Sequence, residues 1–349
     1  MKKKLALALA AVMVLTMALT SCGNDSSSAS SGGGSASSGG GSSASSGGSG
    51  SGLSPKEGGT SLTFTTGGET GTYYGFGSVI AGKVSDMTST SVKAISSGGS
   101  DANIKALQLG DAQIGFSQSD VMVYAYNGER TFTEPVTDFS VVANLYMEQV
   151  QIVTLDPNIK TVADLEGKRV SVGASGSGVY FNAVDVLGAY GLDIEKDITP
   201  TYQDFANSTE ALKDGQIDAA FVVAGAPTTA VTDLASGRDV YLVSLDQEHI
   251  DALIEASPYY SQATISKDVY GTAEDATTVA IGAVVIARDD VSEADVYNFL
   301  YGTFEDIPNL SHGKAAELDL NFAASITSIG YHPGAVAYFA DKGITVSGK

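Results

Sequence analysis

Apolar and aromatic residues recur regularly from Gly59 onward, whereas residues 23 to 54 are almost wholly Ser, Gly and Ala. Within the apolar part, β-like runs such as Leu62 to Thr66 and Arg169 to Val172 each lead through a glycine-rich turn into a segment that we predict to be helical. Alternation of strand and helix along a chain predicts an α/β fold with a mostly parallel sheet, covered on both faces, in each of two lobes.

The apolar part contains an internal repeat. Gly71-Thr72-Tyr73-Tyr74 and Gly178-Val179-Tyr180-Phe181 both read glycine, any residue, tyrosine, aromatic. Later, Ala106-Leu107-x-x-Gly110 with Phe116 is matched by Ala211-Leu212-x-x-Gly215 with Phe221. A glycine just past a helix is the usual left-handed cap, so each copy predicts a helix that ends at Gly110 or Gly215 and leads into a short strand. The alternative is that any two α/β stretches look alike at this level.

The chain has two long apolar runs, Val141 to Val153 and Thr278 to Ala287. Each is long enough to connect two lobes of the protein, so the chain can pass from one lobe to the other and return. About 290 residues follow the Ser/Gly stretch, which is more than one core usually holds. We therefore expect two α/β domains joined by hinge strands around a central cleft that closes over a ligand. The predicted boundaries are 59–149 with 277–349 for lobe I and 150–276 for lobe II.

The N-terminus has a pattern of its own. Three lysines precede an apolar stretch from Leu5 to Leu19, which predicts a secretory signal peptide over residues 1–21. Leu19-Thr20-Ser21-Cys22 resembles the bacterial lipobox, so Cys22 is expected to carry a lipid anchor. The alternative is a leftover free thiol. Residues 22–58 would then be a flexible, disordered tether that spans roughly 30 Å on average.

The formal net charge of -21 excludes some partners. Signal cleavage removes three lysines, leaving 16 basic against 40 acidic residues and a net charge of about -24. Such a surface repels nucleic acid and anionic lipid head groups, so no nucleic-acid partner is expected. With a single cysteine in the chain, no disulfide framework is available to the folded part.

The glycine loops are the candidate binding elements, because ligands of α/β domains bind beyond the carboxyl ends of the strands. Free amides and the positive end of a helix make such loops anion sites. The candidates are Gly68, Thr70, Thr72 and Tyr73, then Ser97, Gly98 and Asn103, then Gln118 and Asp120, and, in the second half, Ser175, Gly176, Ser177, Gly178, Ala226 and Pro227. Tyr146 could add a flat wall with a polar tip. Each loop could equally be ordinary turn chemistry.

The scarcity of arginine bears on the chemistry, because the chain contains only Arg130, Arg169, Arg238 and Arg288. A carboxylate ligand would therefore be held by amides, hydroxyls and tyrosines rather than by an arginine clamp. The three histidines are far apart and in no metal-ligand spacing. No G-x-S-x-G elbow or P-loop occurs. We expect neither an enzyme nor a cofactor or metal site.

From about Leu62 to Ile344, the chain resembles the TAXI family of solute receptors for tripartite ATP-independent periplasmic (TRAP) transporters. The segments that carry the resemblance are the loops Thr66 to Tyr74 and Gly173 to Gly178, Ser97 to Ser100 with Asn103, Gln118-Ser119-Asp120, Asn144 to Tyr146 with Glu148, Val162 to Val170, Asp214 to Phe221, and His332 to Ala335. The resemblance adds Glu148 to the candidate ligand-binding residues. The chain departs from the family pattern in two respects. Glu148 follows Met147 where the family often has proline, and the tether is unusually long.

The resemblance implies a periplasmic-binding-protein fold of type II. It also implies a ligand such as glutamate, 2-oxoglutarate or a C4-dicarboxylate, and TRAP membrane subunits as partners. The protein would be a monomer, lipid-anchored to the outer face of the cytoplasmic membrane of a single-membrane bacterium. Two alternatives remain: a receptor of the same fold that signals to a membrane kinase, and an enzyme on this scaffold. His332-Pro333 and Thr161-x-x-Asp164 are better explained as helix starts than as sites.

Overall fold

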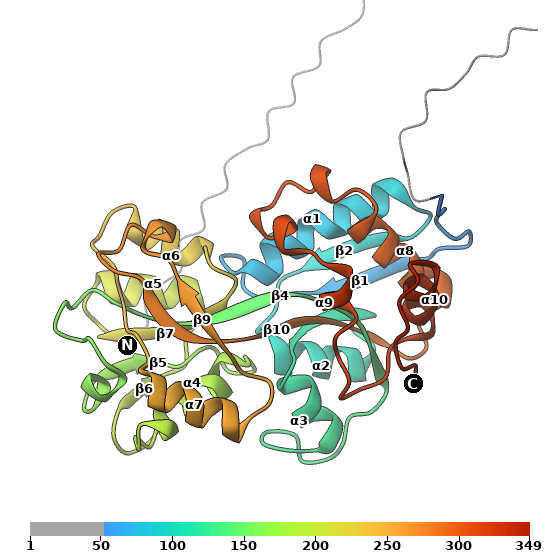
Figure 1. Cartoon of the computed structure of the whole chain (residues 1–349). Helices are drawn as coiled ribbons and strands as arrows, with labels where there is room; N and C mark the ends of the chain where they lie inside the picture. The colour runs from blue at the N-terminus through green and yellow to red at the C-terminus, as the bar shows by residue number, and fades with distance from the viewer. Residues whose placement is uncertain (1–51) are drawn as a thin grey trace, which may run out of the picture. The chain divides into compact units, whose positions relative to one another are not determined.

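The structure of the protein is a computed structural model that describes residues 52–349 (Figure 1). The predicted signal peptide and Cys22 lie outside the described residues. The strands are β1 (Ser61–Thr65), β2 (Ser91–Ile95), β3 (Ile114–Gln118), β4 (Phe139–Thr154), β5 (Arg169–Ser171), β6 (Thr199–Thr201), β7 (Ala219–Ala224), β8 (Tyr241–Leu242), β9 (Ser261–Ile265) and β10 (Ala276–Arg288). The α-helices are α1 (Thr72–Met87), α2 (Ser100–Leu109), α3 (Val121–Asn127), α4 (Val179–Ala189), α5 (Phe205–Lys213), α6 (Thr229–Ala235), α7 (Gln247–Ala256), α8 (Glu293–Phe304), α9 (Leu320–Ala323) and α10 (Pro333–Asp341).

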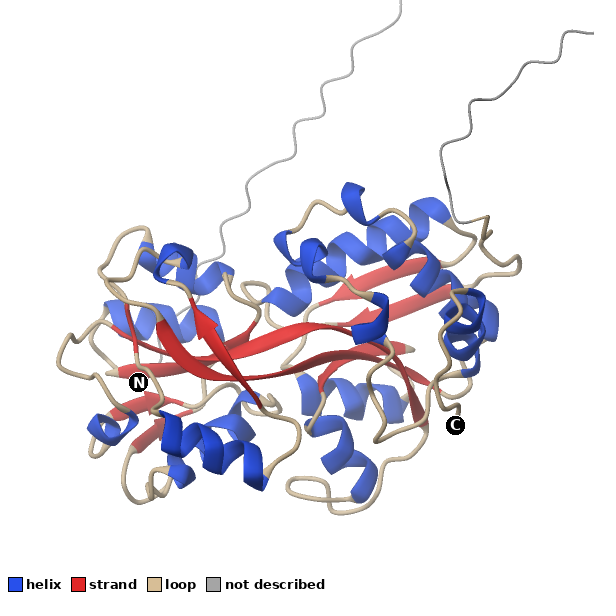
Figure 2. Ribbon diagram, viewed as in Figure 1, coloured by secondary structure: helices blue, strands red, loops and turns tan. Residues whose placement is uncertain are grey.

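Two long strands run through both halves of the molecule. β4 and β10 pair antiparallel from Ala280 opposite Gln149 to Arg288 opposite Phe139, and each also pairs with strands on both sides. The strand order is β2-β1-β3-β10-β4-β7-β5-β6, with β8 beside β4 and β9 beside β10. These are the two apolar runs that the sequence predicts to cross between the halves. Figure 2 shows helices on both faces of the strands.

The expectation of a separate sheet in each lobe is wrong in one respect. Parallel pairs do occur within each half, β1 with β2 and β3, and β5 with β6 and β7. The two crossing strands, however, join these sets into one continuous hydrogen-bonded path. They can do so because β4 has 16 residues and β10 has 13, enough to pair in both halves.

The apolar cores divide the molecule in two. One core draws on residues 62–146 and 283–339, with Phe181 as its single member from elsewhere. The other two draw on residues 150–281. We call the first half lobe I, which carries α1–α3 and α8–α10, and the second half lobe II, which carries α4–α7. The exact boundaries stay predictions, because β4 and β10 belong to both.

Several local expectations are confirmed. Gly110 caps α2 in the left-handed conformation with φ 83°, and Gly215 follows α5 with φ 65°. His332 is the N-cap of α10 with Pro333 at its first position, and Thr161 and Asp164 form a capping box. These residues therefore have structural roles. Within residues 52–349, no helix is both long enough and apolar enough to cross a membrane.

The end of the predicted tether lies against lobe I. The Lys56 backbone amide donates to the Asn298 side chain at 2.7 Å, and the Asn298 amide donates back to the Lys56 carbonyl at 2.9 Å. The Lys56 ammonium lies 4.2 Å from the centre of the Tyr297 ring. Lys56, which lies within the predicted tether of residues 22–58, is thus held on α8.

Candidate functional site

A cavity of about 180 Å³ lies where the loops at the ends of the strands meet between the lobes. Lobe I contributes the loop after β1, the loop after β2, and the end of β3. Lobe II contributes the loop before α4, the start of α5, and the end of β7. The lining residues are Gly67, Gly68, Gly71, Thr72, Tyr73, Ser97, Gly98, Gly99, Ser100, Gln118, Glu148, Ala174, Ser177, Gly178, Val179, Asp204, Phe205, Val223 and Ala224.

Four helices begin at this cavity, and three of them have a glycine as the N-cap. Gly71, Gly99 and Gly178 precede α1, α2 and α4, and none of them supplies a side chain to accept the first-turn amides. The first residue of each helix lines the cavity. Val179 already donates its amide to the Ser177 hydroxyl at 3.0 Å. The cavity therefore receives the positive ends of three helices that carry no capping side chain of their own.

Most other helices begin differently. An acceptor side chain caps α3, α5, α7, α8, α9 and α10, namely Asp120, Asp204, Asp246, Ser292, Asp319 and His332. A capping carboxylate neutralises part of the positive end of a helix and occupies its free amides. The three glycine-capped helices at the cavity lack this neutralisation, so the amides of their first turns, apart from those that already have acceptors, such as Val179 and Ala102, are the donors available to a bound group.

The polar wall from lobe I includes a buried carboxyl. The Tyr73 hydroxyl donates to Glu148 Oε2 at 2.8 Å, and both side chains are buried. Burial raises the pKa of Glu148 well above its usual range, only partly offset by the Tyr73 hydrogen bond. Burial therefore favours the protonated, neutral form of this carboxyl, which carries a proton that it can donate.

Lobe II contributes the apolar wall. Val179, Phe205, Val223 and Ala224 line the cavity from α4, α5 and β7. Asp204 lies at its exposed edge, where both carboxylate oxygens accept from Asn207. Among the described residues that line the cavity there is no lysine, arginine, histidine or cysteine. Lobe II therefore adds hydrocarbon to the site, beside the Ser177 hydroxyl and the N-terminus of α4.

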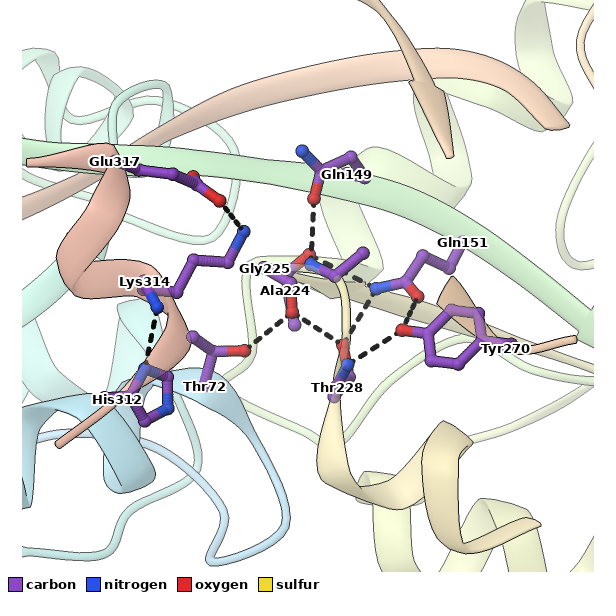
Figure 3. Close-up of polar contacts among 11 residues, drawn as sticks. Thr72, Gln149, Gln151, Ala224, Gly225, Thr228, Tyr270, His312, Lys314 and Glu317 are labelled. Atoms are coloured by element: carbon purple, nitrogen blue, oxygen red, sulfur yellow. Dashed lines mark hydrogen bonds and ion pairs between the residues drawn. The ribbon is translucent and has the colours of Figure 1, made fainter. Parts of the chain in front are cut away.

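The lobes touch directly on the α1 side of the cavity (Figure 3). The Thr72 hydroxyl donates to the Gly225 carbonyl of lobe II at 2.9 Å, and the Ala230 amide donates to the Thr70 carbonyl at 3.1 Å. Between the glycine loops, the Ala102 amide donates to the Gly176 carbonyl at 2.9 Å. These bonds bridge the cleft without an intervening group, so the arrangement is closed.

A second contact closes the α3 side. The Gln118 amide donates to Asn182 Oδ1 at 2.9 Å, and Asn182 donates to the Tyr260 hydroxyl at 2.8 Å. Arg130 of lobe I pairs with Asp185 of α4 at 2.7 Å. Burial raises the pKa of Asp120, which caps α3 beside this network, to about 7.

The structure brings half of the predicted site residues to the cavity. Those that line it are Gly68, Thr72, Tyr73, Ser97, Gly98, Gln118, Glu148, Ser177 and Gly178. Gly178 is needed here because a side chain would meet Gln118 Oε1 at 2.0 Å. Glycine is favoured at Gly99 because residues with a side chain rarely adopt its φ of 109°, and an added Cβ would lie 3.3 Å from the Ser177 Cα.

The other predicted residues lie elsewhere: Thr70, Asn103, Asp120, Tyr146, Ser175, Gly176, Ala226 and Pro227 are outside the lining. Asn103 is a buried brace, donating to the carbonyls of Thr66 at 2.6 Å and Phe116 at 2.8 Å. The Tyr146 ring packs on Phe76 and Phe116 behind the cavity. Thr70 and Gly176 bond across the cleft through their carbonyls, and Ser175 and Pro227 are exposed.

The sequence interpretation missed the apolar wall. Phe205 follows Asp204, a helix start that resembles many others, and Val223 looks like an ordinary strand residue. Five further lining residues carried a signal because they belong to the glycine loops already singled out: Gly67, Gly71, Gly99, Ser100 and Ala174. The described residues also hold no cluster of three histidine, cysteine or acidic side chains that could bind a metal ion.

Comparison with known proteins agrees with this architecture. A protein described as a periplasmic transporter has 13% sequence identity and a TM-score of 0.51, with coverage of 81% of this chain and 93% of that chain. MatC from Rhodopseudomonas palustris, solved with bound malate, has 13% identity and a TM-score of 0.50, with coverage of 73% and 86%. At such identities the likeness concerns the fold, and the two-lobed type II periplasmic-binding-protein fold is confirmed. A model of the NMT1-like family matches residues 64–343, and the chain therefore belongs to the NMT1-like family.

Proposed function

We propose that the protein is an extracytoplasmic solute-binding lipoprotein that captures a small organic anion between its lobes and delivers it to membrane subunits of a TRAP-type transporter. The observation that carries the proposal is the meeting of three glycine-capped helix N-termini at one closed cavity. Unoccupied amides at helix N-termini bind carboxylates and other anions through hydrogen bonds and the helix dipole.

The buried Glu148 is compatible with an anion. A charged carboxylate at this position would repel the ligand, but burial raises the pKa of Glu148 and so favours its neutral form. A neutral carboxyl can donate its proton to a ligand oxygen, as the Tyr73 hydroxyl already does to Glu148. The apolar wall of Phe205 and Val223 favours a ligand with a short hydrocarbon body, such as glutamate, 2-oxoglutarate or a C4-dicarboxylate.

Delivery to TRAP subunits and membership of the TAXI type rest on the resemblance of the glycine loops and of the segments between them. Anchoring through Cys22 rests on the lipobox pattern. A neighbouring gene for multi-span permease subunits would support delivery to a transporter, whereas one for a membrane sensor kinase would support a signalling receptor.

A thermal-shift panel of amino acids, 2-oxo acids, dicarboxylates, neutral sugars and cations tests the ligand class. A ligand at a hundred times its dissociation constant adds about 2.7 kcal/mol to folding, so a true ligand raises the melting temperature clearly. We expect carboxylates alone to do so. If only sugars or cations raised it, the anion assignment would be wrong.

A further inference from the structure

The Gly225 carbonyl lies at the end of a buried hydrogen-bond chain in lobe II (Figure 3). It accepts from the Thr228 hydroxyl at 3.0 Å. Thr228 in turn accepts from Gln151 Nε2 at 2.9 Å and donates its amide to the Tyr270 hydroxyl at 2.8 Å. Tyr270 completes the circuit by donating to Gln151 Oε1 at 2.6 Å. The chain thus runs from the crossing strand β4 to the loop after β7.

A carbonyl oxygen has two acceptor positions, and this one is shared between the lobes. Thr228 of lobe II fills the first position, and the Thr72 hydroxyl of lobe I fills the second. Each hydroxyl in the chain has one proton to donate, and each uses it within the chain. Gln151 also donates to the Ala224 carbonyl at 3.2 Å, which fixes the peptide next to Gly225.

Lys314 crosses the cleft at the same point. It belongs to a short 3₁₀ turn, Gly313–Glu317, of lobe I, and it is buried with only 3% exposure. A side chain added at Gly225 would meet Lys314 Cε at 2.3 Å and Nζ at 3.2 Å. The Lys314 ammonium is neutralised by Glu317 at 2.5 Å. The lysine stem therefore packs over Gly225, and a side chain at this position would require Lys314 to shift.

We propose that Thr72, Gly225 and Lys314 form a latch that favours the closed arrangement of the lobes, with Gln151 as the residue that positions its acceptor. The proposal rests on the proposed function only in that the latch closes the cleft where the ligand is captured. Opening would separate the Thr72 hydroxyl from its acceptor and expose the lysine stem to water. The latch contacts join protein atoms alone, so the latch favours the closed arrangement before a ligand binds.

A distance measurement between the lobes tests the latch in ligand-free protein. The mature chain with Cys22→Ser has no other cysteine, so spin labels can be placed at Leu109→Cys of α2 and Glu210→Cys of α5. Both side chains are well exposed, at 75% for Leu109 and 66% for Glu210. Pulsed electron resonance should then resolve a closed and an open distance.

Thr72→Val keeps the shape of the side chain and removes the donor. Loss of one buried hydrogen bond is expected to lower the closed-to-open ratio by about two- to ten-fold. Thr303→Val is the matched control, because that buried hydroxyl bonds within α8 to the Phe299 carbonyl. It should lower the melting temperature and leave the ratio unchanged.

Gly225→Ala should lower the closed-to-open ratio because Lys314 must shift, and adding Lys314→Ala should raise the ratio again by making room. If circular dichroism shows that Gly225→Ala does not fold, the closed-to-open ratio of Thr72→Val is the test of the latch. Two results would overturn the proposal: a ligand-free parent with only the open distance, or a Thr72→Val variant with the parental ratio. Failure of the carboxylate panel would leave these distances unaffected, so the two proposals fail separately.

Discussion

The Tyr73 hydroxyl donates a 2.8 Å hydrogen bond to the Glu148 carboxyl, and this pair joins the first turn of α1 to the crossing strand β4 at the wall of the cavity. The Tyr73 ring also stacks on Phe116, with ring centres 4.5 Å apart. A ligand that reaches Tyr73 therefore contacts a side chain already fixed on two sides.

Tyr73→Phe should destabilise the protein and weaken ligand binding. It leaves a buried carboxyl without its donor, which typically costs about 1 to 3 kcal/mol. Urea unfolding measures the first effect, and titration with the best carboxylate from the thermal-shift panel measures the second. Tyr297→Phe is the control, because its hydroxyl bonds to the half-exposed Asp341 far from the cavity. Equal affinity loss in both variants would contradict a role for Tyr73 in binding.

Asp120 predicts a pH dependence with a defined sign. Burial raises its pKa from 3.8 to about 7. A folded-state pKa above the unfolded value means that the folded protein holds the proton more tightly, so this contribution to stability is complete below about pH 4 and is lost as pH rises through about 7. Asp120→Asn keeps an acceptor for the α3 cap and cannot ionise. Its stability relative to the parent should therefore increase between pH 4 and pH 8.

Asp246 provides the opposite case for the same assay. It caps α7, and its hydrogen bond to His249 lowers the pKa of the carboxyl. Its contribution is present above the unfolded pKa and lost as pH falls through the lower folded value. Asp246→Asn should thus lose stability at neutral pH and lose less in acid. A pH-independent difference for Asp120→Asn would show that this carboxyl does not titrate near 7.

Ser177 and Ser175 form a natural pair for testing the loop before α4. Ser177 lines the cavity and is buried, whereas Ser175, two residues earlier, is exposed and outside the lining. Hydrogen bonds to charged groups are worth roughly 1.5 to 3 kcal/mol, so Ser177→Ala should weaken binding of a carboxylate about ten-fold or more. The unliganded stability should change little, since only the bond from the Val179 amide is lost. Ser175→Ala should bind as the parent does, and the same affinity for both variants would remove Ser177 from the site.

Gly178 tests whether the close approach of the lobes matters for binding. Gly178→Ala places a methyl group 2.0 Å from Gln118 Oε1, so the lobes must separate or Gln118 must move. We expect at least a ten-fold loss of ligand affinity, measured by calorimetry. Gly188→Ala, within the same helix and with nothing near its added methyl, should stabilise the protein by about 0.5 to 1 kcal/mol and leave affinity unchanged. Parental affinity in Gly178→Ala would argue against closure onto this contact.

The sequence by itself determined the features that depend on short stretches of chain. The glycines before α1 and α4, the left-handed caps at Gly110 and Gly215, and the apolar runs of β4 and β10 were all predictable, because propensity and capping act within one turn or strand. The cleft between two lobes followed from two long apolar runs separated by a repeated half. Half of the candidate site residues followed from the position of glycine loops at strand ends.

Only the tertiary structure decided which of those residues share a cavity. Asn103 looks like a ligand donor, yet the register of β1 beside β3 places two carbonyls against its amide and uses it as a brace. Phe205 becomes part of the site because α5 packs against Gly71 of the other lobe. Gly225 and Lys314 are far apart in the chain, and a side chain at position 225 would meet the side chain of Lys314. Such contacts depend on how the lobes close, and a local pattern carries no information about an approach between segments that distant in sequence.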